Sequence, residues 1–186
     1  TIDGSLWFGT FMGLYRYNDG EWQSVLDKVG PLEGGATAIC ETSNGDFWFG
    51  TQRNGLVRYR YGLWHPQVPT TGYIVYLYES KDRSVWVSLY HNGVFRYNGQ
   101  TLTKFSRADG LASDNVWFIY QTRDGALWFG GDSGVSKYTL GKWETLTTAN
   151  GLPDNTALSM CETKDGSLWF GTRGGATRYH KGTYQT

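Results

Sequence analysis

A five-residue motif centred on tryptophan occurs five times in this chain of 186 residues. It reads LWFGT at residues 6–10 and 168–172, FWFGT at 47–51, VWVSL at 85–89 and LWFGG at 127–131. The central residues are Trp7, Trp48, Trp86, Trp128 and Trp169, which are 41, 38, 42 and 41 residues apart. A period of about 40 residues predicts a repeat architecture in which each unit is one supersecondary element.

Each repeat unit is expected to contain four short strands, because its apolar residues alternate with polar ones or form runs of four to six. The motif itself is the second strand. The expected inner strands are 38–42, 75–80, 117–122 and 158–163. The expected third strands are 14–18, 56–60, 94–98, 135–139 and 176–180, and the expected fourth strands are 21–25, 63–67, 101–105, 142–146 and 183–186.

The turn between the inner strand and the tryptophan strand carries Asn-Gly or Asp-Gly at residues 44–45, 124–125 and 165–166. Such pairs suit a two-residue hairpin with positive φ at both positions. The third unit has Asp82-Arg83 instead. This difference predicts either backbone strain of about 1 kcal/mol at Arg83 or a different turn.

The composition agrees with an all-β chain, since 26 glycines supply many turns and 17% of the residues are aromatic. Antiparallel four-stranded units repeated at this period predict a β-propeller, whose units are blades around a central channel. We expect about five blades in a single domain or segment over residues 1–186. The expected blades are residues 1–29 (partial), 30–69, 70–106, 107–147 and 148–186.

The first blade is expected to lack its inner strand, because Thr1 aligns with Thr42, Thr122 and Thr163, which follow the inner strands of later units. A sheet without that strand exposes unpaired backbone groups and an apolar face. We therefore expect the chain to be a piece of a larger array, or to be completed by a neighbouring chain. Self-association through the incomplete first blade is a partner hypothesis that follows from this.

The charge balance, 17 Lys and Arg against 17 Asp and Glu, gives a net charge of zero. Such a chain has no field to attract a phosphate backbone, so nucleic acid is not an expected partner. No apolar run approaches the roughly 20 residues that span a bilayer. Direct membrane insertion is therefore not expected.

The last unit carries a longer pattern that identifies a known repeat. It consists of Gly151-Leu152-Pro153-Asp154-Asn155, Glu162, Asp165-Gly166, Leu168-Trp169-Phe170-Gly171-Thr172 and Arg178-Tyr179. This pattern closely resembles the two-component regulator propeller repeat. In that family the repeats form extracytoplasmic sensor regions of bacterial hybrid histidine kinases that often respond to oligosaccharides. The resemblance implies a periplasmic or extracellular sensor domain for signal transduction.

Residue types that recur in every unit are expected to serve the fold, because one binding site on an axis needs no five copies. The five motif tryptophans are assigned to the blade core, each wedged between adjacent blades. The residues that close the inner strands, Glu41, Glu79, Gln121 and Glu162, are expected to hydrogen-bond a turn or a neighbouring blade.

Binding is expected where the units differ, in the loops on the face that carries the second-to-third and fourth-to-inner strand connections. Aromatic rings there could cover sugar faces, and Arg, Asn and Asp could meet hydroxyl or acid groups. Tyr76 and Phe118 also interrupt an otherwise small-residue pattern at the strand starts. The candidate ligand-binding residues are Gln52, Arg53, Asn54, Tyr73, Tyr90, His91, Asn92, Trp117, Asp132 and Arg173.

The sequence offers no convincing catalytic site. Gly131-Asp132-Ser133-Gly134 matches a protease nucleophile segment, but it aligns with an ordinary turn and lacks a His and Asp context. The three histidines have no metal-ligand spacing. We expect no enzyme activity, no metal and no cofactor. Cys40 and Cys161 lie in equivalent positions of distant units and are expected to be reduced core residues.

The sequence therefore favours a non-enzymatic ligand-binding sensor propeller that recognises an oligosaccharide or other small polar ligand. A structural or protein-interaction propeller, including an engineered repeat protein that oligomerises, is the alternative. A polysaccharide lyase or hydrolase is the third reading.

Overall fold

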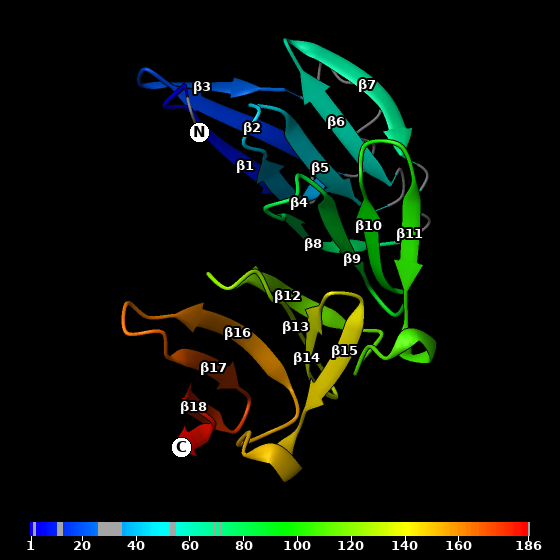
Figure 1. The fold of residues 1–186 in the computed structure, drawn as a ribbon. Coiled ribbons are helices and arrows are strands. Elements are labelled where there is room, and N and C mark those ends of the chain that lie inside the picture. The colour runs from blue at the N-terminus through cyan, green and yellow to red at the C-terminus, as the bar shows by residue number, and fades with distance from the viewer. Residues whose placement is uncertain are drawn as a thin grey trace. The chain divides into compact units, whose positions relative to one another are not determined.

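The structure is a computed structural model that describes residues 1, 3–10, 13–25, 35–52, 55–68, 70 and 72–185. These residues form 19 strands in five sheets, the first with three strands and the others with four. Strand order follows chain order within each sheet (Figure 1). The all-β class and the four-strand unit expected from the sequence are confirmed.

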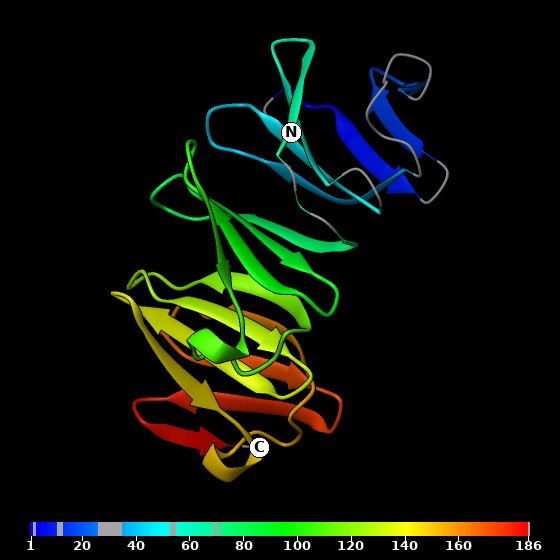
Figure 2. The same ribbon diagram turned by 90° about the vertical axis from the view of Figure 1, so that its right-hand side faces the viewer.

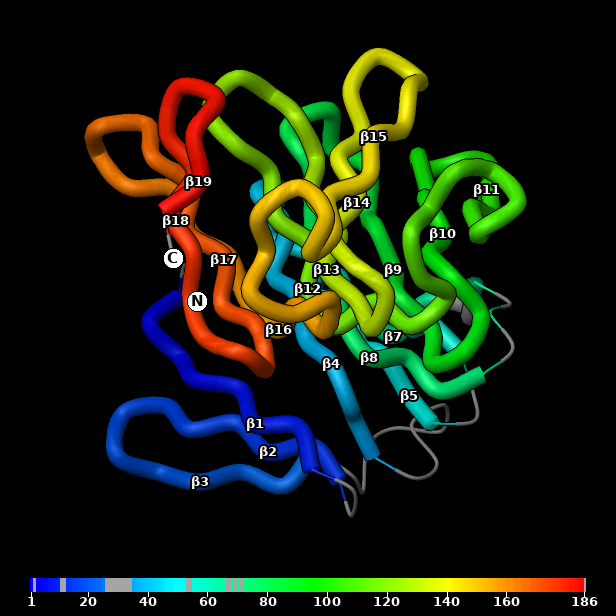
Figure 3. Tube along the Cα trace, turned by 90° about the horizontal axis from the view of Figure 1, so that it is seen from below, coloured from blue at the N-terminus to red at the C-terminus, as the bar shows by residue number. Residues whose placement is uncertain are grey.

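The strands of the first three sheets have the following bounds. The first sheet contains β1 (Leu6–Thr10), β2 (Gly13–Asn18) and β3 (Glu21–Ser24). The second contains β4 (Ala36–Glu41), β5 (Phe47–Thr51), β6 (Leu56–Arg60) and β7 (Leu63–Val68). The third contains β8 (Ile74–Glu79), β9 (Val85–Leu89), β10 (Gly93–Tyr97) and β11 (Leu102–Phe105). Figure 3 shows the strands of the first sheet, drawn in blue, side by side.

A short 3-10 helix precedes each of the last two sheets. These helices are η2 (Arg107–Asp109), before the fourth sheet, and η3 (Thr148–Asn150), before the fifth. The fourth sheet contains β12 (Val116–Gln121), β13 (Leu127–Gly131), β14 (Gly134–Thr139) and β15 (Lys142–Leu146). The fifth contains β16 (Ala157–Glu162), β17 (Leu168–Thr172), β18 (Gly175–His180) and β19 (Thr183–Gln185).

The chain divides into two compact units, Thr1–Glu79 and Ser80–Thr186, and the boundary falls between β8 and β9. In the first unit, Leu14, Phe49 and Val57 form a buried cluster, and the Trp7 ring packs 5.0 Å from the Phe47 ring. The cluster thus joins the first and second sheets through their tryptophan strands.

The second unit has an equivalent core, in which Trp128, Val135 and Phe170 belong to one buried cluster. The Trp128 and Phe170 rings lie 5.5 Å apart. Figure 2 shows the fourth sheet, in yellow-green and yellow, packed next to the orange and red fifth sheet. In both units, therefore, a motif tryptophan of one sheet contacts the residues beside the tryptophan position in the next.

The ends of the inner strands also join neighbouring sheets. The Glu79 carboxylate accepts a 2.7 Å hydrogen bond from the backbone N–H of Ser43. The Gln121 amide oxygen does the same for Lys81 N–H at 2.7 Å, and Glu162 for Arg123 N–H at 2.8 Å. The expectation that these residues hydrogen-bond a neighbouring turn is confirmed for these three.

The turns before the tryptophan strands differ from the expected two-residue type. Thr42 O accepts from Gly45 N–H at 2.8 Å, and Thr42 N–H donates to Asp46 O at 2.8 Å. Only the glycine has positive φ, at 81°. The loop therefore has three residues, a turn followed by a left-handed glycine.

The third unit keeps the same turn without glycine. Arg83 N–H donates to Ser80 O at 2.8 Å, and Arg83 adopts a φ of 68°. Of the two alternatives that the sequence left open, strain at Arg83 is the one that the structure adopts.

Candidate functional site

The inner strands β4, β12 and β16 share a β-bulge that sets the candidate site. Their register with the tryptophan strand shifts between the first and third residues, as between Val116 and Phe118 in β12. The extra residue is Thr37 in β4, Trp117 in β12 and Leu158 in β16. A bulge re-aims the side chain of its extra residue, and only β12 places an aromatic ring there.

The half-buried Trp117 is held in place by an acid from the next turn. Its indole Nε1–H donates to Asp132 Oδ1 at 2.7 Å. The second carboxylate oxygen accepts from Asn115 Nδ2 at 2.8 Å, and Asn115 Oδ1 accepts from the backbone N–H of His91 at 2.7 Å. This network fixes the ring while leaving part of it open to solvent.

The turn after β9 adds a second ring beside Trp117. The Tyr90 side chain is 47% exposed, and its ring centroid lies 6.1 Å from that of Trp117 and 4.0 Å from that of His91. His91 adopts a φ of 55°. Two partly open aromatic rings beside an amide and a carboxylate can hold a ligand with apolar faces and hydroxyl edges. We call Tyr90, His91, Asn115, Trp117 and Asp132 the aromatic cluster.

The other candidate residues do not enter this cluster. Gln52 follows β5, and Tyr73, exposed, precedes β8, both in the first unit. Asn92 accepts from Lys104 Nζ at 2.5 Å, and the exposed Arg173 donates its backbone N–H to Thr156 O at 3.0 Å. Arg53 and Asn54 lie outside the described residues.

Two corrections concern the starts of the inner strands. Phe118, expected to add to the ligand face, is buried, and a Cβ on Gly130 would overlap its ring. Asn115 was not singled out from the sequence, although it joins Asp132 to His91. The available signal was its position just before an inner strand, where the fifth unit has Thr156 instead.

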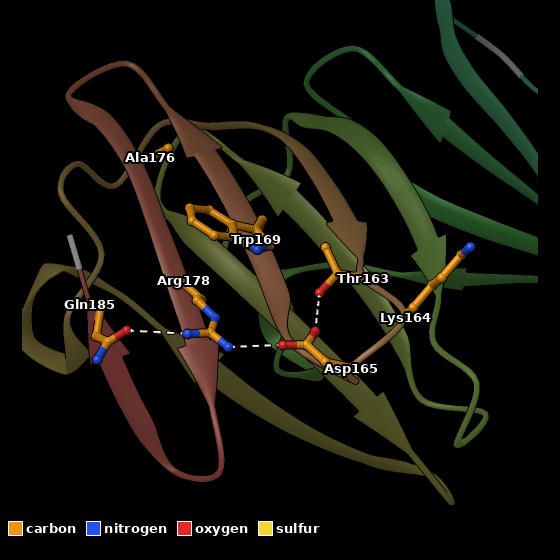
Figure 4. A pocket seen from close by; sticks show the side chains of 7 residues that line it. All are labelled: Thr163, Lys164, Asp165, Trp169, Ala176, Arg178 and Gln185. Carbon is orange, nitrogen blue, oxygen red and sulfur yellow. Dashed lines mark hydrogen bonds and ion pairs between the residues drawn. The ribbon is translucent and has the colours of Figure 1, made fainter.

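The motif tryptophans are buried in three sheets, Trp48, Trp86 and Trp128, and partly buried in the first. Trp169, which the sequence placed in the core with them, is 40% exposed. It lines a shallow hollow of about 650 Å³ on the fifth sheet with Thr163, Lys164, Asp165, Ala176, Arg178 and Gln185 (Figure 4). The difference arises because no described sheet covers this face.

A polar network crosses this open face. Arg178 Nη2 donates to Asp165 Oδ2 at 2.9 Å (Figure 4). The Arg178 Nε donates to Ser167 Oγ at 3.0 Å. The Thr163 hydroxyl donates to Asp165 Oδ1 at 2.5 Å. Hydrogen bonds from Thr163 and Ser167, with a further one from Arg178, hold the pKa of the Asp165 carboxyl well below its usual value.

Two further hollows of about 400 and 420 Å³ lie between neighbouring sheets of the second unit. The first includes Trp128 and Lys137, and the second includes Trp86 and Arg96. The two hollows occupy equivalent positions between successive sheets. No residue of the aromatic cluster lines either of them. The cluster is therefore a surface site rather than an enclosed pocket.

The described residues contain no group of three or more His, Cys, Asp or Glu side chains placed to hold a metal ion. Asp132 is the acid of the protease-like segment. Its two carboxylate oxygens accept hydrogen bonds from Trp117 and Asn115. Cys40 is partly buried, and burial raises the pKa of its thiol to about 11. Cys161, expected in the core, is exposed because it pairs with Trp169 on the open sheet.

Among the described residues, no helix has both the length and the apolar character needed to cross a bilayer.

Solved structures share this fold. The extracellular domain of a hybrid two component system from B. thetaiotaomicron superimposes with a TM-score of 0.82 at 23% identity, over 98% of this chain and 27% of that one. The extracellular domain of a one component system from B. thetaiotaomicron gives 0.82 at 23%, over 99% and 26%. This chain thus spans about a quarter of those two domains.

Virginiamycin B lyase from Staphylococcus aureus is also similar, with a TM-score of 0.77 at 21% identity over 98% of this chain and 66% of that one. At these identities the likeness establishes the fold alone, a β-propeller of four-stranded blades, as the sequence predicted. No curated protein sequence matches the chain.

Three segments, residues 31–53, 110–133 and 151–174, match the family described as two component regulator propeller. They cover parts of the second, fourth and fifth repeat units. These three repeat units therefore match the two component regulator propeller family.

Proposed function

We propose that the chain is a non-enzymatic ligand-sensing segment of an extracytoplasmic receptor, and that the aromatic cluster binds the ligand. The observation that carries the proposal is Trp117, whose indole is half-open and whose N–H is held by Asp132 at 2.7 Å. A ring that served only to fill the core would be buried, as Phe118 beside it is. In this proposal the five expected blades, residues 1–29, 30–69, 70–106, 107–147 and 148–186, form the scaffold of one propeller segment.

The proposed ligand is an oligosaccharide or another small polar molecule. Rings such as Tyr90 and Trp117 can cover the apolar face of a sugar, and the Asn115 and Asp132 side chains can accept or donate at its hydroxyl edge. The similar extracellular domains of two component and one component systems support a periplasmic or extracellular sensor. Gln52, Tyr73, Asn92 and Arg173 remain candidate contacts outside the cluster, as do Arg53 and Asn54.

Ligand binding is tested by screening the chain on a glycan array and measuring the affinity for each hit by calorimetry. We expect Trp117→Ala to weaken binding by about tenfold or more, which corresponds to roughly 1.4 kcal/mol. The melting temperature should stay unchanged because the ring is not part of the buried cluster. Asp132→Asn should weaken binding less, since an amide oxygen can still accept from the indole.

Trp22→Ala is the matched control, because Trp22 is an exposed tryptophan of the first sheet, outside the aromatic cluster. It should leave affinity unchanged. If Trp117→Ala lowers the melting temperature and leaves affinity intact, the ring is structural and the proposal fails. Release of products from an oligosaccharide would favour a lyase or hydrolase instead.

A second candidate function is protein interaction through the first sheet, including self-association. Leu6 and Phe8 are 51% and 42% exposed, although the equivalent Phe47 and Phe49 are buried. An exposed apolar pair of this kind is typical of an interaction surface. Sedimentation velocity tests it: wild-type chain should associate with rising concentration, and Phe8→Ser should remain monomeric. A monomeric wild type would exclude self-association.

A further inference from the structure

The carboxylate of Asp132 differs from other bonded acids of the second unit in having no cationic partner. Asp82 and Asp165 each form an ion pair with an arginine, at 2.6 and 2.9 Å. Within residues 80–185, which the structure describes without a gap, no basic side chain lies within 4.0 Å of the Asp132 carboxylate. Its negative charge is therefore unpaired within this unit.

Asp132 also retains room for further hydrogen bonds. One carboxylate oxygen accepts from Trp117 Nε1 at 2.7 Å and the other from Asn115 Nδ2 at 2.8 Å, and both donors are neutral. An ionised carboxylate offers about four lone-pair positions. Because the Asp132 side chain is exposed, a ligand can donate to those that the protein leaves unused.

The two aromatic rings beside this carboxylate suit a cation. Trp117 is half-buried and Tyr90 is 47% exposed, with ring centroids 6.1 Å apart and planes tilted by 47°. The face of an aromatic ring attracts a positive charge, and indole attracts it most strongly. The hydrogen bond from the indole N–H to Asp132 polarises the ring further in the same direction.

Elsewhere in the second unit, a side chain of the protein supplies the cation over a tryptophan. Arg96 lies 5.8 Å from the centre of the Trp86 ring, and Lys137 lies 5.6 Å from that of Trp128. Within residues 80–185, no lysine or arginine takes this position over the two rings of the aromatic cluster. The cluster thus repeats the pairing of ring and acid while leaving the cation to be supplied from outside.

The basic side chains that reach the adjoining turn do not neutralise Asp132. Lys104 Nζ donates to Asn92 Oδ1 at 2.5 Å and lies 5.8 Å from the centre of the Phe95 ring. The His91 imidazole is charged only when it is protonated. With a neutral His91, the aromatic cluster carries the single negative charge of Asp132.

We propose that the aromatic cluster recognises a sugar that carries a positively charged amino group. The ammonium group donates to the unused lone pairs of Asp132, and the apolar face of the same sugar lies against Trp117 and Tyr90. This inference rests on the proposed function and narrows its ligand class to cationic amino sugars.

The charge of the site disfavours the other kinds of sugar. An acidic sugar would bring a second negative charge next to Asp132, and such a like-charge contact is unfavourable. A neutral sugar can cover the rings, but it leaves the carboxylate without a counter-charge. Selectivity for the amino group therefore comes from Asp132, and affinity for the sugar ring comes from Trp117 and Tyr90.

The test compares three trisaccharides with the same backbone that differ only at the second carbon of each sugar. Chitotriose carries an amine there, its acetylated form carries a neutral acetamide, and cellotriose carries a hydroxyl. Their affinities for the full chain are measured by calorimetry at neutral pH, where chitotriose is cationic. The measurements are made at low and at high salt.

We expect chitotriose to bind about tenfold or more tightly than either neutral trisaccharide at low salt. The preference should shrink at high salt, because the attraction to an exposed carboxylate is screened. Asp132→Asn should reduce the preference to less than about twofold. Trp117→Ala should instead weaken the binding of all three trisaccharides, because the ring contacts the part that they share.

Glu144→Gln is the matched control for the loss of one negative charge. The Glu144 side chain is 68% exposed on β15 and lies outside the aromatic cluster, so this variant should keep the preference for chitotriose. The melting temperature of each variant is measured alongside its affinity. The comparison of the three trisaccharides on the wild-type chain does not depend on any variant.

Each contrary outcome has a distinct meaning. Equal affinities for the three trisaccharides would overturn the inference and leave the proposed function standing, because the cluster would bind sugars without selecting their charge. A preference that survives Asp132→Asn would also overturn it, since another group would hold the amine. If none of the three binds, the inference fails, and the glycan array decides the proposed function separately.

Discussion

Trp128 and Trp169 occupy the same position of the same motif in the fourth and fifth sheets, yet they are 4% and 40% exposed. The local sequences, LWFGG and LWFGT, are nearly identical. What differs is the neighbour, because Phe170 lies 5.5 Å from the Trp128 ring and no described residue takes that place over Trp169. Burial of the indole is therefore a property of the pair of sheets and not of the repeat.

The polar part of the face behaves differently, because each sheet builds it alone. Arg178 binds Asp165 on the open fifth sheet, and Arg96 binds Asp82 at 2.6 Å in the third. The comparison thus separates two contributions. Apolar cover is supplied by the next sheet, and the charged network is already present in its absence.

The largest expected effect comes from removing the two indoles. Trp128→Ala should lower the free energy of unfolding by about 3–5 kcal/mol, because it leaves a cavity between two sheets. Trp169→Ala should lower it by about 1 kcal/mol, since much of that ring is already in water. Urea unfolding followed by near-UV circular dichroism measures both. Equal losses of unfolding free energy would contradict the comparison, because they would show that each sheet stabilises its own ring without cover from the next sheet.

A smaller effect is expected at the turns. Arg123→Ala removes hydrogen bonds from an exposed guanidinium to Thr163 O and Lys164 O and should cost about 0.5–1 kcal/mol. Lys164→Ala should change the free energy of unfolding by no more than about 0.3 kcal/mol. Lys164 occupies the equivalent position of the fifth sheet, but its exposed side chain donates to no described carbonyl group. The two variants are compared by urea unfolding at low salt. A larger loss for Lys164→Ala than for Arg123→Ala would contradict the expectation that the cationic side chain stabilises only where a following turn accepts its hydrogen bonds.

The smallest effect concerns acid stability, in which the two sheets should agree. Hydrogen bonds from Thr122 and Thr163 lower the pKa values of Asp124 and Asp165 below their ordinary value of 3.8. Because folding lowers these pKa values, the stabilisation is complete above about pH 5 and is lost as the pH falls below about 4. Asp124→Asn and Asp165→Asn should both flatten the fall in stability between pH 5 and 2.

Glu21→Gln removes one negative charge from the exposed strand β3 and controls for net charge in that experiment. Unfolding free energies at several pH values provide the measurement. A flattening confined to Asp124→Asn would mean that the covering sheet, and not the turn itself, sets the acid response.

Sequence repetition predicted most of the fold for a physical reason. Five copies of one motif average out local ambiguity, and the tryptophan strands lie where they were expected. The inner strands begin one or two residues earlier, at Ala36, Ile74, Val116 and Ala157. In β4, β12 and β16 a bulge adds a residue that breaks the alternation. The turn type was wrong because an Asn-Gly pair is common to two-residue and three-residue loops.

The candidate site was predictable only in part. Variation between units pointed to Tyr90, His91, Trp117 and Asp132, which the structure brings together. It did not point to Asn115, whose role depends on a hydrogen bond to His91 that spans 24 positions of the chain. The exposure of Trp169 could not be predicted from the sequence around it, because the same pentapeptide surrounds the partly buried Trp7.

The one-way order of the contacts between sheets has a consequence for synthesis on the ribosome. Trp7, Trp86 and Trp128 are each covered by aromatic residues that are translated later, as Trp7 is by Phe47 and Phe49. At ordinary translation speeds, the next 40 or so residues take on the order of 2–8 s to emerge. A nascent chain of this kind therefore always carries one unfinished sheet at its growing end, and it is there that a chaperone would find an apolar target.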